Sequence, residues 1–168
     1  MSNDKNLKNN EAIKKIKELV KDITSCMFCT DVFQLPFRTR PMATIDVDDQ
    51  GNVWFFSNAA SDKNDEIKSN DIVQLIYAKN SNSHFLTITG KAEIIKDKNK
   101  IEELWNPMVK AWFPEGKDDP DLSLIKVIPQ DAYYWDTPHG KMVTLLKIAV
   151  SAVTGTKLEE GVHGKIKV

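Results

Sequence analysis

Hydrophobic residues recur at helical spacing near the start of the chain. The apolar positions, three or four residues apart with lysines between them, are Ile13, Ile16, Leu19, Val20 and Ile23. Such spacing places apolar side chains on one face of a helix. Asn9 and Asn10 precede the pattern and belong to a residue type that caps helices. The pattern therefore predicts an amphipathic helix over residues 10–23 with its lysines toward solvent.

Short runs rich in β-branched and aromatic residues fill the middle of the chain, and each is a candidate strand. They cover residues 26–30, 41–47, 53–57, 72–77, 85–95, 122–128 and 132–135. Two helices are expected among them, at 62–69 and 98–110. The stretch Asp48-Asp49-Gln50-Gly51-Asn52 is a hairpin-turn signal. Many short strands with few helices favour a mainly β fold with flanking helices, forming a small closed or partly closed barrel.

The same pattern divides the chain into three parts. Residues 1–24 are expected to form the helix that packs on the barrel, and residues 25–156 the barrel domain. Residues 157–168 are rich in glycine and lysine and are expected to form a flexible tail. With 168 residues, 41% of them hydrophobic, the chain can bury a core without disulfides or metals.

Charge and hydropathy limit the classes of partner that the protein is expected to bind. A formal net charge of −1 argues against a broad nucleic-acid footprint, because such binding neutralises many phosphates. No apolar run is long enough to span a bilayer, and the polar, lysine-rich N-terminus lacks the apolar stretch of a signal peptide. We therefore expect a cytoplasmic protein with neither nucleic acid nor membrane as partner.

A hydroxyl-rich turn joins a predicted strand to a predicted helix. The segment is Phe56-Ser57-Asn58-Ala59-Ala60-Ser61-Asp62-Lys63. Free N–H groups at a helix start, two hydroxyls and the Lys63 ammonium suit a phosphate. The neighbouring aromatic residues Trp54, Phe55 and Phe56 suggest a ligand with a flat ring. The alternative for Lys63 is a solvated surface lysine.

Arg40-Pro41-Met42 supplies a second part of this candidate site. Arg40 can contact a phosphate through two N–H groups, although a surface arginine is the alternative. Pro41 cannot donate to a strand ladder, so it marks an edge or an opening of the sheet, and a flat ring can lie against it.

Together these motifs resemble those of a known family. Phe-Ser-Asn-x-x-Ser-x-Lys, followed by Glu66-Ile67, resembles the strand–turn–helix segment of the pyridoxamine 5'-phosphate oxidase-like, FMN-binding split barrels. The motifs that resemble its bacterial general stress protein branch are Arg40-Pro41-Met42, Gly90-Lys91-Ala92-Glu93, Trp105, Ala111-Trp112-Phe113-Pro114 and Tyr134-Trp135-Asp136. The resemblance spans residues 25–146 and implies a split β-barrel that binds FMN, with FAD or another flavin as alternatives.

The resemblance also implies a homodimer with the flavin at its interface. Trp112 and Trp135 are the candidates for closing the site there, although tryptophans are most often core or interface residues. The cofactor-binding residues expected on these grounds are Arg40, Pro41, Met42, Phe56, Ser57, Ser61, Lys63, Trp112 and Trp135.

The chain departs from the true oxidases at two places. Asp62 stands where those enzymes usually carry a basic residue, which predicts weaker phosphate binding, and Asp62 can instead serve as a helix cap. After Trp135, residues 136–142 contain no arginine, and His139 and Lys141 are the only candidates for a second anion site. Oxidation of pyridoxamine 5'-phosphate is therefore not expected.

Two functions from different classes remain open, with no catalytic side chain assigned. One is an FMN-dependent oxidoreductase of unknown small-molecule substrate, in which the flavin carries the electrons. The other is a flavin-binding stress protein without turnover, which stores or senses the cofactor. A weaker alternative is a structural barrel without cofactor.

The cysteines and histidines, the remaining candidate ligands, are explained without a metal site. Cys26 and Cys29 have C-x-x-C spacing, but positions three apart on a strand point to opposite faces, and two further zinc ligands are not evident. Both are expected to be small buried hydrophobic residues, and no metal site is expected. His84, His139 and His163 adjoin no carboxylate or cysteine pattern and are expected at the surface or in loops.

Overall fold

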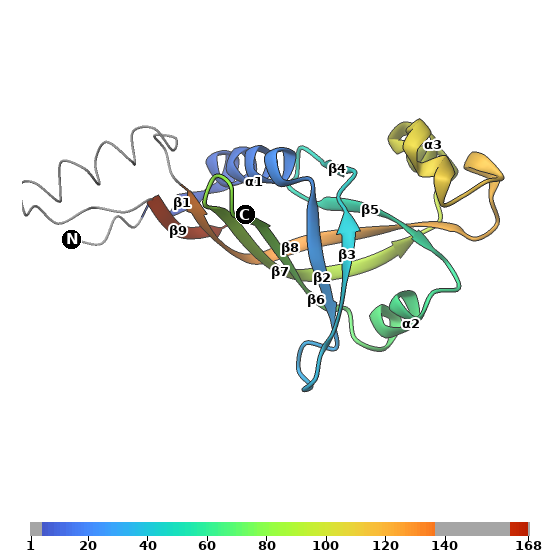
Figure 1. The fold of residues 1–168 in the computed structure, drawn as a ribbon, viewed down its shortest axis with the longest axis horizontal. Coiled ribbons are helices and arrows are strands. Elements are labelled where there is room, and N and C mark those ends of the chain that lie inside the picture. Colours follow the sequence, from blue (N-terminus) through green and yellow to red (C-terminus); the bar gives the residue numbers. More distant parts are fainter. Residues whose placement is uncertain (1–4, 137–161, 168) are drawn as a thin grey trace, which may run out of the picture.

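The described strands form one mixed sheet that does not close on itself (Figure 1). The computed structural model describes residues 5–136 and 162–167. Its strands are β1 (Leu7–Lys8), β2 (Ser25–Thr30), β3 (Arg38–Ala43), β4 (Asp46–Val47), β5 (Val53–Asn58), β6 (Ile72–Lys79), β7 (His84–Ile95), β8 (Leu122–Asp136) and β9 (Val162–Lys167). Its helices are α1 (Asn9–Ile23), α2 (Asp62–Ser69) and α3 (Lys98–Leu104), with 3₁₀ turns η1 (Pro107–Ala111) and η2 (Gly116–Asp118). The predicted mainly β fold with flanking helices is confirmed.

Strand β8 is central to the sheet, because it pairs with β5, β7 and β9. The order is β1-β9-β8-β7-β6-β2-β3, and β5 also pairs with β8 and carries β4. The first half of β8 lies between β5 and β7, while its last residues lie between β7 and β9. The sheet therefore branches along β8, and β3 is left as an edge strand.

Helix α1 covers one side of this sheet (Figure 1). Its buried positions, Ala12, Ile16, Leu19 and Val20, belong to the main core. That core includes Phe28 and Phe55, whose rings meet edge to face with centroids 5.3 Å apart. The predicted amphipathic helix is confirmed, but the expected asparagine cap is wrong. Lys8 precedes the helix without a side-chain cap, and Asn9 is its first residue, with a φ of 51°.

A smaller core lies under α3 and η1. Trp54, Leu104, Phe113 and Leu124 are among its buried members. The predicted helix at 98–110 ends at Leu104, because Pro107 cannot donate to a continuing helix and starts η1 instead. This break turns η1 and the following Trp112 toward β3 and β5.

Two predicted strand boundaries differ from the structure for identifiable reasons. The run at 41–47 splits into β3 and β4, since Thr44 N–H donates to Thr24 and Ile45 N–H to Trp54. The runs at 122–128 and 132–135 are one strand, β8, because a register shift between Thr89 and Gly90 accommodates Pro129. The hairpin turn at 48–52 is confirmed, with β4 and β5 antiparallel on either side of it.

The end of the chain also differs from expectation. Residues 157–168 were expected to form a flexible tail, but Val162–Lys167 is strand β9, paired with β8 and with β1. Gly164 makes this possible, since a Cβ atom there would lie 2.3 Å from the Lys5 carbonyl oxygen. Within the described residues, no helix has the length and apolar character that crossing a membrane requires.

Candidate functional site

A cavity of about 500 Å³ opens between β3, β5, the start of α2 and the residues after η1. Its walls are formed by Arg40, Pro41, Met42, Ala43, Ile45, Phe56, Ser57, Asn58, Lys63, Val109, Trp112 and Phe113. Of the nine predicted cofactor-binding residues, all except Ser61 and Trp135 line it. The structure therefore brings together segments that are far apart in the sequence.

Lys63 lies at the polar end of the cavity, in the first turn of α2. Its Nζ is 2.5 Å from Ser57 Oγ and 3.0 Å from Ser61 Oγ. The turn before α2 is held by hydrogen bonds from Ser61 N–H and Ser61 Oγ to the Asn58 carbonyl. Burial and the charge of Arg40 lower the pKa of Lys63 to about 8, although Glu66 acts in the opposite direction. An anion bound here would relieve the cost of this crowded ammonium.

The guanidinium of Arg40 is held in place by hydrogen bonds, chiefly to the buried carboxylate of Glu66. Its Nη2 donates to Glu66 at 2.8 Å and its Nη1 to Thr30 Oγ1 at 2.8 Å. Glu66 also accepts from Thr30 at 2.5 Å and from Arg38 at 3.0 Å. Burial raises the pKa of the Glu66 carboxyl, but the bonds from Thr30 and Arg40 outweigh it and hold that pKa below its ordinary value. Arg38, Arg40 and the nearby Lys63 are three cations against two carboxylates, Glu66 and Asp31, the second paired with Arg38 at 3.8 Å, which leaves this corner positive.

Sequence reasoning used Glu66 only as part of a motif and missed its role as the partner of Arg40. The two residues lie on different elements, β3 and α2, so their contact depends on the fold. The signal that could have found it is the carboxylate itself, one helical turn after Lys63, where it can accept from basic residues on a neighbouring strand.

Aromatic and apolar side chains form the other end of the cavity. Phe56 packs edge to face on Trp105, with ring centroids 5.9 Å apart. Trp112 is 72% exposed at the rim, and Phe113 beneath it is buried. Trp54 is also buried, outside the cavity, and donates its indole N–H to Asp48. The cavity therefore combines a cationic end with a flat apolar wall.

Trp135 lies apart from the cavity within a single chain. It stands on β8, where it is 42% exposed and its ring centroid is 4.6 Å from that of Tyr133. Its strand partners are Phe85 and His163.

Asp62 is the first residue of α2 and Ser61 occupies the cap position, so the expectation that Asp62 caps the helix is wrong.

The two cysteines behave as the sequence indicates. Both are free thiols buried in β2. Burial raises the pKa of the Cys26 thiol to about 12, so the reactive thiolate is disfavoured.

The expectation for His84 is wrong, because it lies between two carboxylates. Its Nδ1 is 2.9 Å from Asp22 and its Nε2 is 3.0 Å from Asp136. Lys79 pairs with Asp22 and Lys15 with Asp136, both at 2.5 Å. This cluster fastens α1 to the start of β7 and the end of β8. His139 and Lys141 lie outside the described residues, as does the rest of the segment after Asp136.

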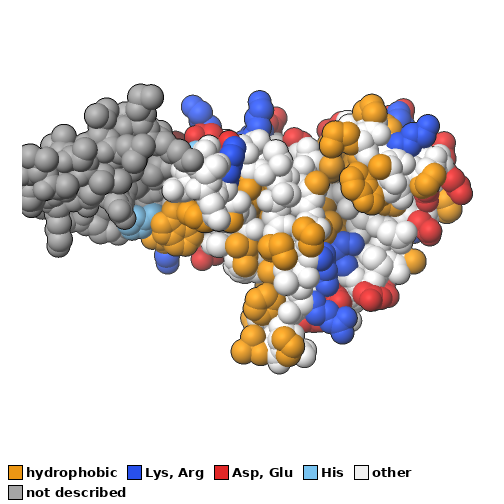
Figure 2. All heavy atoms as spheres, in the orientation of Figure 1, with side chains coloured by type: hydrophobic (Ala, Val, Ile, Leu, Met, Phe, Trp, Pro, Cys, Tyr) orange, Lys and Arg blue, Asp and Glu red, His pale blue; other side chains and the backbone are white. Residues whose placement is uncertain are grey.

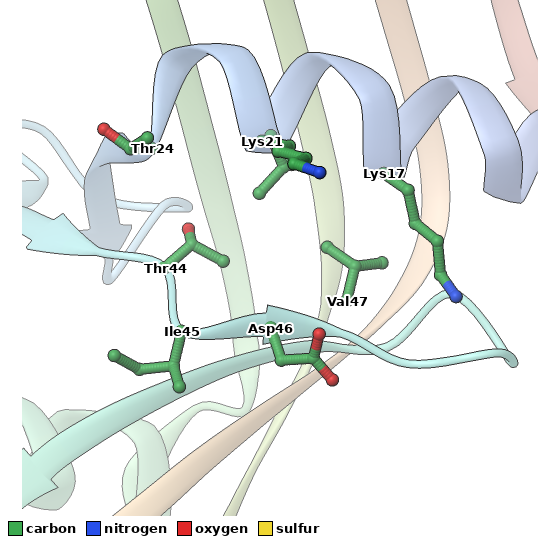
Figure 3. Close-up of a pocket in the computed structure, with 8 residues that line it drawn as sticks. Lys17, Lys21, Thr24, Thr44, Ile45, Asp46 and Val47 are labelled. Atoms are coloured by element: carbon green, nitrogen blue, oxygen red, sulfur yellow. The ribbon is translucent and has the colours of Figure 1, made fainter. Parts of the chain in front are cut away.

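A second cavity, of about 480 Å³, lies between α1 and the β3–β4 segment (Figure 3). Lys17, Lys21, Thr44 and Asp46 line it, and Lys17 Nζ is paired with Asp49 at 2.6 Å. None of the nine predicted cofactor-binding residues lies there. The first cavity is therefore the better candidate site.

The chain is similar in sequence and in structure to known proteins. The family model described as pyridoxamine 5'-phosphate oxidase like matches residues 11–159. Protein bli-3 of Neurospora crassa is 25% identical over 112 residues, which span 62% of this chain and 54% of that protein's length. The structure of a putative general stress protein 26 from Jannaschia sp. CCS1 matches with a TM-score of 0.80 at 22% identity, covering 92% of this chain and 97% of that one. The general stress FMN/FAD binding protein of Xanthomonas citri matches with a TM-score of 0.63 at 27% identity, covering 74% and 87%.

Proposed function

Because this chain belongs to the pyridoxamine 5'-phosphate oxidase-like family, we propose that it is a flavin-binding general stress protein that holds FMN in the cavity between β3, β5 and α2. The observation that carries the proposal is the placement of Lys63, bonded to Ser57 and Ser61, at one end of a cavity whose other end is aromatic. FMN has a phosphate at one end and a flat ring at the other. The Xanthomonas citri relative is a general stress FMN/FAD binding protein, which supports the same ligand class.

The residues divide into two groups in this proposal. Lys63 and Arg40 neutralise the phosphate, and the turn of Ser57 and Ser61 holds Lys63 in place. Pro41, Met42, Phe56 and Trp112 pack against the ring. When bound, the flavin would supply the redox chemistry, while these residues bind it, orient it and exclude water.

We further propose that the bound flavin makes the protein an oxidoreductase, with flavin storage or sensing as the second candidate. The polar side chains of described residues that line the cavity are Arg40, Ser57, Asn58 and Lys63, and in this proposal the one with a lowered pKa, Lys63, is committed to the phosphate. This favours a reaction in which the cofactor carries the chemistry. The test is anaerobic addition of NADPH or NADH to the FMN-loaded protein: rapid bleaching of the flavin absorbance is expected of the oxidoreductase, and no bleaching with either donor would favour storage or sensing.

Flavin binding itself is tested by fluorescence titration of the purified protein with FMN, FAD and riboflavin. We expect FMN to bind about ten- to a hundredfold more tightly than riboflavin, because riboflavin lacks the phosphate that Lys63 and Arg40 would contact. Equal affinity for FMN and riboflavin would contradict the phosphate assignment, and no binding of any flavin would contradict the proposed function.

We also propose a homodimer formed through the sheet face opposite α1. Strand register aligns Pro41, Met27, Ile76, Thr87 and Tyr133 in one row across five strands. Met27 is 40% exposed and Ile76 38%. Figure 2 shows hydrophobic side chains gathered on this face of the molecule, beside basic ones.

Three observations support a second copy as the partner that covers this face. β3 is an edge strand, which a partner can cover. The β2–β3 loop adds the exposed side chains of Phe33, Leu35 and Phe37. Pro41 belongs both to the exposed row and to the cavity wall, so a second copy would stand beside the cavity. The flavin would then lie at the interface, within reach of a partner's Trp135.

Replacing Trp112 with alanine is expected to weaken FMN binding about three- to tenfold, because an aromatic pair contributes ~0.5–1.5 kcal/mol. The barrel should keep its melting temperature, since Trp112 is 72% exposed. Met108→Ala is a matched control, because Met108 is 76% exposed and is not among the cavity residues. Equal losses in both variants would argue against a specific role for Trp112.

Replacing Asp62 with arginine is expected to tighten FMN binding about two- to fivefold, because it removes an exposed negative charge next to Lys63 and adds a positive one. Asp65→Arg, at another exposed carboxylate of α2, changes the net charge equally but three residues farther along. Titrations at low and at high salt should show the gain for Asp62 shrinking with salt. A gain of the same size at Asp65 would mean that only the net charge matters.

A further inference from the structure

A chain of buried hydrogen bonds lies directly behind Lys63. Ser57 Oγ is 2.7 Å from Asn64 Oδ1, Asn64 Nδ2 is 3.1 Å from Ser123 Oγ, and Ser123 Oγ is 2.9 Å from the Ser57 carbonyl oxygen. Asn64 and Ser123 are fully buried, and Ser57 is 3% exposed. Asn64 does not line the cavity, so the flavin-site motifs leave it without a role.

The direction of each bond in this chain follows from the one before it. The Ser57 carbonyl oxygen can only accept, so the Ser123 hydroxyl proton points to it. Ser123 Oγ then has only lone pairs for Asn64, which must turn its NH₂ group toward Ser123 and its Oδ1 toward Ser57. Asn64 Oδ1 can only accept, so the Ser57 hydroxyl proton points to it at 2.7 Å and not to the Asn58 carbonyl at 3.3 Å. Ser57 therefore offers only lone pairs to Lys63.

Ser61 offers lone pairs to Lys63 in the same way. Its hydroxyl proton goes to the Asn58 carbonyl at 2.7 Å, and Lys63 Nζ lies 3.0 Å from its oxygen. An ammonium has three N–H donors. Ser57 and Ser61 accept two of them, so one is left for an anion in the cavity.

From this geometry we propose that Asn64 is a positioning residue for the anion site: by holding the Ser57 hydroxyl proton, it makes Ser57 a fixed acceptor that orients and stabilises the Lys63 ammonium. The proposal rests on the proposed function in one respect only, namely that the anion is the FMN phosphate. The Ser57 hydroxyl thus donates to Asn64 and accepts from Lys63, whereas the sequence had suggested that it donates to the phosphate.

The charged groups that act on Lys63 are few, so the effect of Asn64 can be isolated. Arg40 on β3 disfavours the ammonium and Glu66 on α2 favours it, while the neighbouring carboxylate of Asp62 is exposed to solvent. β5 contributes the Ser57 hydroxyl, and the residues from η1 onward contribute Val109, Trp112 and Phe113, which carry no charge. Removing Asn64 Oδ1, which holds the Ser57 hydroxyl proton, should make deprotonation of the Lys63 ammonium easier. A carboxylate at position 64 should make that deprotonation harder.

The test is a pair of substitutions with opposite expected effects. Asn64→Leu frees the Ser57 hydroxyl, and the titration midpoint of Lys63 should move down by about 0.5–1 pH unit. Asn64→Asp keeps the shape and an acceptor for Ser57 but adds a negative charge, so the midpoint should move up. The midpoint is read from the Cε–Hε signals of ¹³C-lysine-labelled protein without flavin, assigned with Lys63→Arg.

Flavin titrations then show whether the shift in the Lys63 midpoint also changes the pH dependence of FMN binding. The pH above which FMN affinity declines should fall in Asn64→Leu and rise in Asn64→Asp. Asn52→Leu is the matched control, because Asn52 is also buried and hydrogen-bonded but belongs to the 48–52 turn. It should lower the melting temperature and leave the Lys63 midpoint unchanged.

Shifts in the same direction in both Asn64 variants, or no shift in either, would overturn the proposal. If Asn64→Leu fails to fold, Asn64→Ala removes the same acceptor with a smaller side chain, and the Lys63 midpoint should still move down. The two proposals fail separately: wild-type protein that binds no flavin refutes the FMN site, while the lysine titration of the flavin-free protein still measures the role of Asn64.

Discussion

Lys63→Ala should lower FMN affinity by about ten- to a hundredfold, the value of one charged contact to a buried phosphate, ~1.5–3 kcal/mol. The measurement is a fluorescence titration near pH 7. Lys68→Ala is the matched control, since Lys68 lies on the same helix but is 60% exposed and pairs only with Asp65 among the described residues. An affinity for Lys63→Ala within twofold of wild type would contradict the assignment.

The pH dependence of binding provides a sharper form of this prediction. The pKa of Lys63 is lowered to about 8, so below pH 8 the ammonium is present and binding needs no proton. Above pH 8 the neutral amine must take up a proton to meet the phosphate, and affinity should fall by up to about tenfold per pH unit. Below pH ~6 the phosphate itself loses one charge, which sets the lower limit of the plateau.

Two variants isolate the contribution of Lys63 to this profile. Lys63→Arg keeps its charge at every pH used, so its affinity should stay level above pH 8. Lys63→Ala should also be level there, but at lower affinity. A decline above pH 8 that persists unchanged in both variants would assign it to another group.

Ile76→Asp should convert the proposed dimer to a monomer. Ile76 lies in the middle of the exposed row on the sheet face and is already 38% exposed in one chain, so the monomer should tolerate the change. A symmetric interface would bury two unpaired carboxylates, at several kcal/mol each, which raises the dissociation constant by about a thousandfold or more. Light scattering after gel filtration at micromolar concentration measures the mass.

Ile76→Asp should also lower FMN affinity when it removes the dimer, because Pro41 belongs both to the cavity and to the sheet face. Lys14→Asp is a suitable control, since Lys14 is exposed on α1, which covers the other side of the sheet. A monomer mass for the wild-type protein with FMN present would refute the dimer. A monomeric Ile76→Asp with unchanged FMN affinity would instead show that each chain holds the flavin alone.

The local parts of the site were predictable from the sequence. The strand, turn and helix from Phe56 to Lys63 follow from hydrophobic and capping signals within a dozen residues, and α2 has the predicted bounds. The partners of these residues were not predictable in the same way. Arg40 meets Glu66, and His84 meets Asp22 and Asp136, only because the register of distant strands brings them together.

Strand errors have the same physical origin. Pro129 within residues 122–135 reads as a break, and only the shift in the facing strand at Gly90 shows that β8 continues through it. A Cβ at Gly90 would lie 2.4 Å from the Ile128 carbonyl oxygen, so the glycine is required by close approach of the backbones. Gly164 in β9 misleads in the same way, because a glycine next to a lysine also fits a loose tail.

The pairing of β9 has a consequence for how the protein is made. Leu7 in β1 lies opposite Ile166 in β9, and Tyr134 donates its hydroxyl hydrogen bond to the Lys5 carbonyl. Contacts between residues so far apart in the sequence form late and slow folding. While the ribosome is still adding residues, β1 has no β9 to pair with. We therefore expect the nascent chain to complete this sheet only after residues 162–167 have emerged, and to depend until then on protection from aggregation.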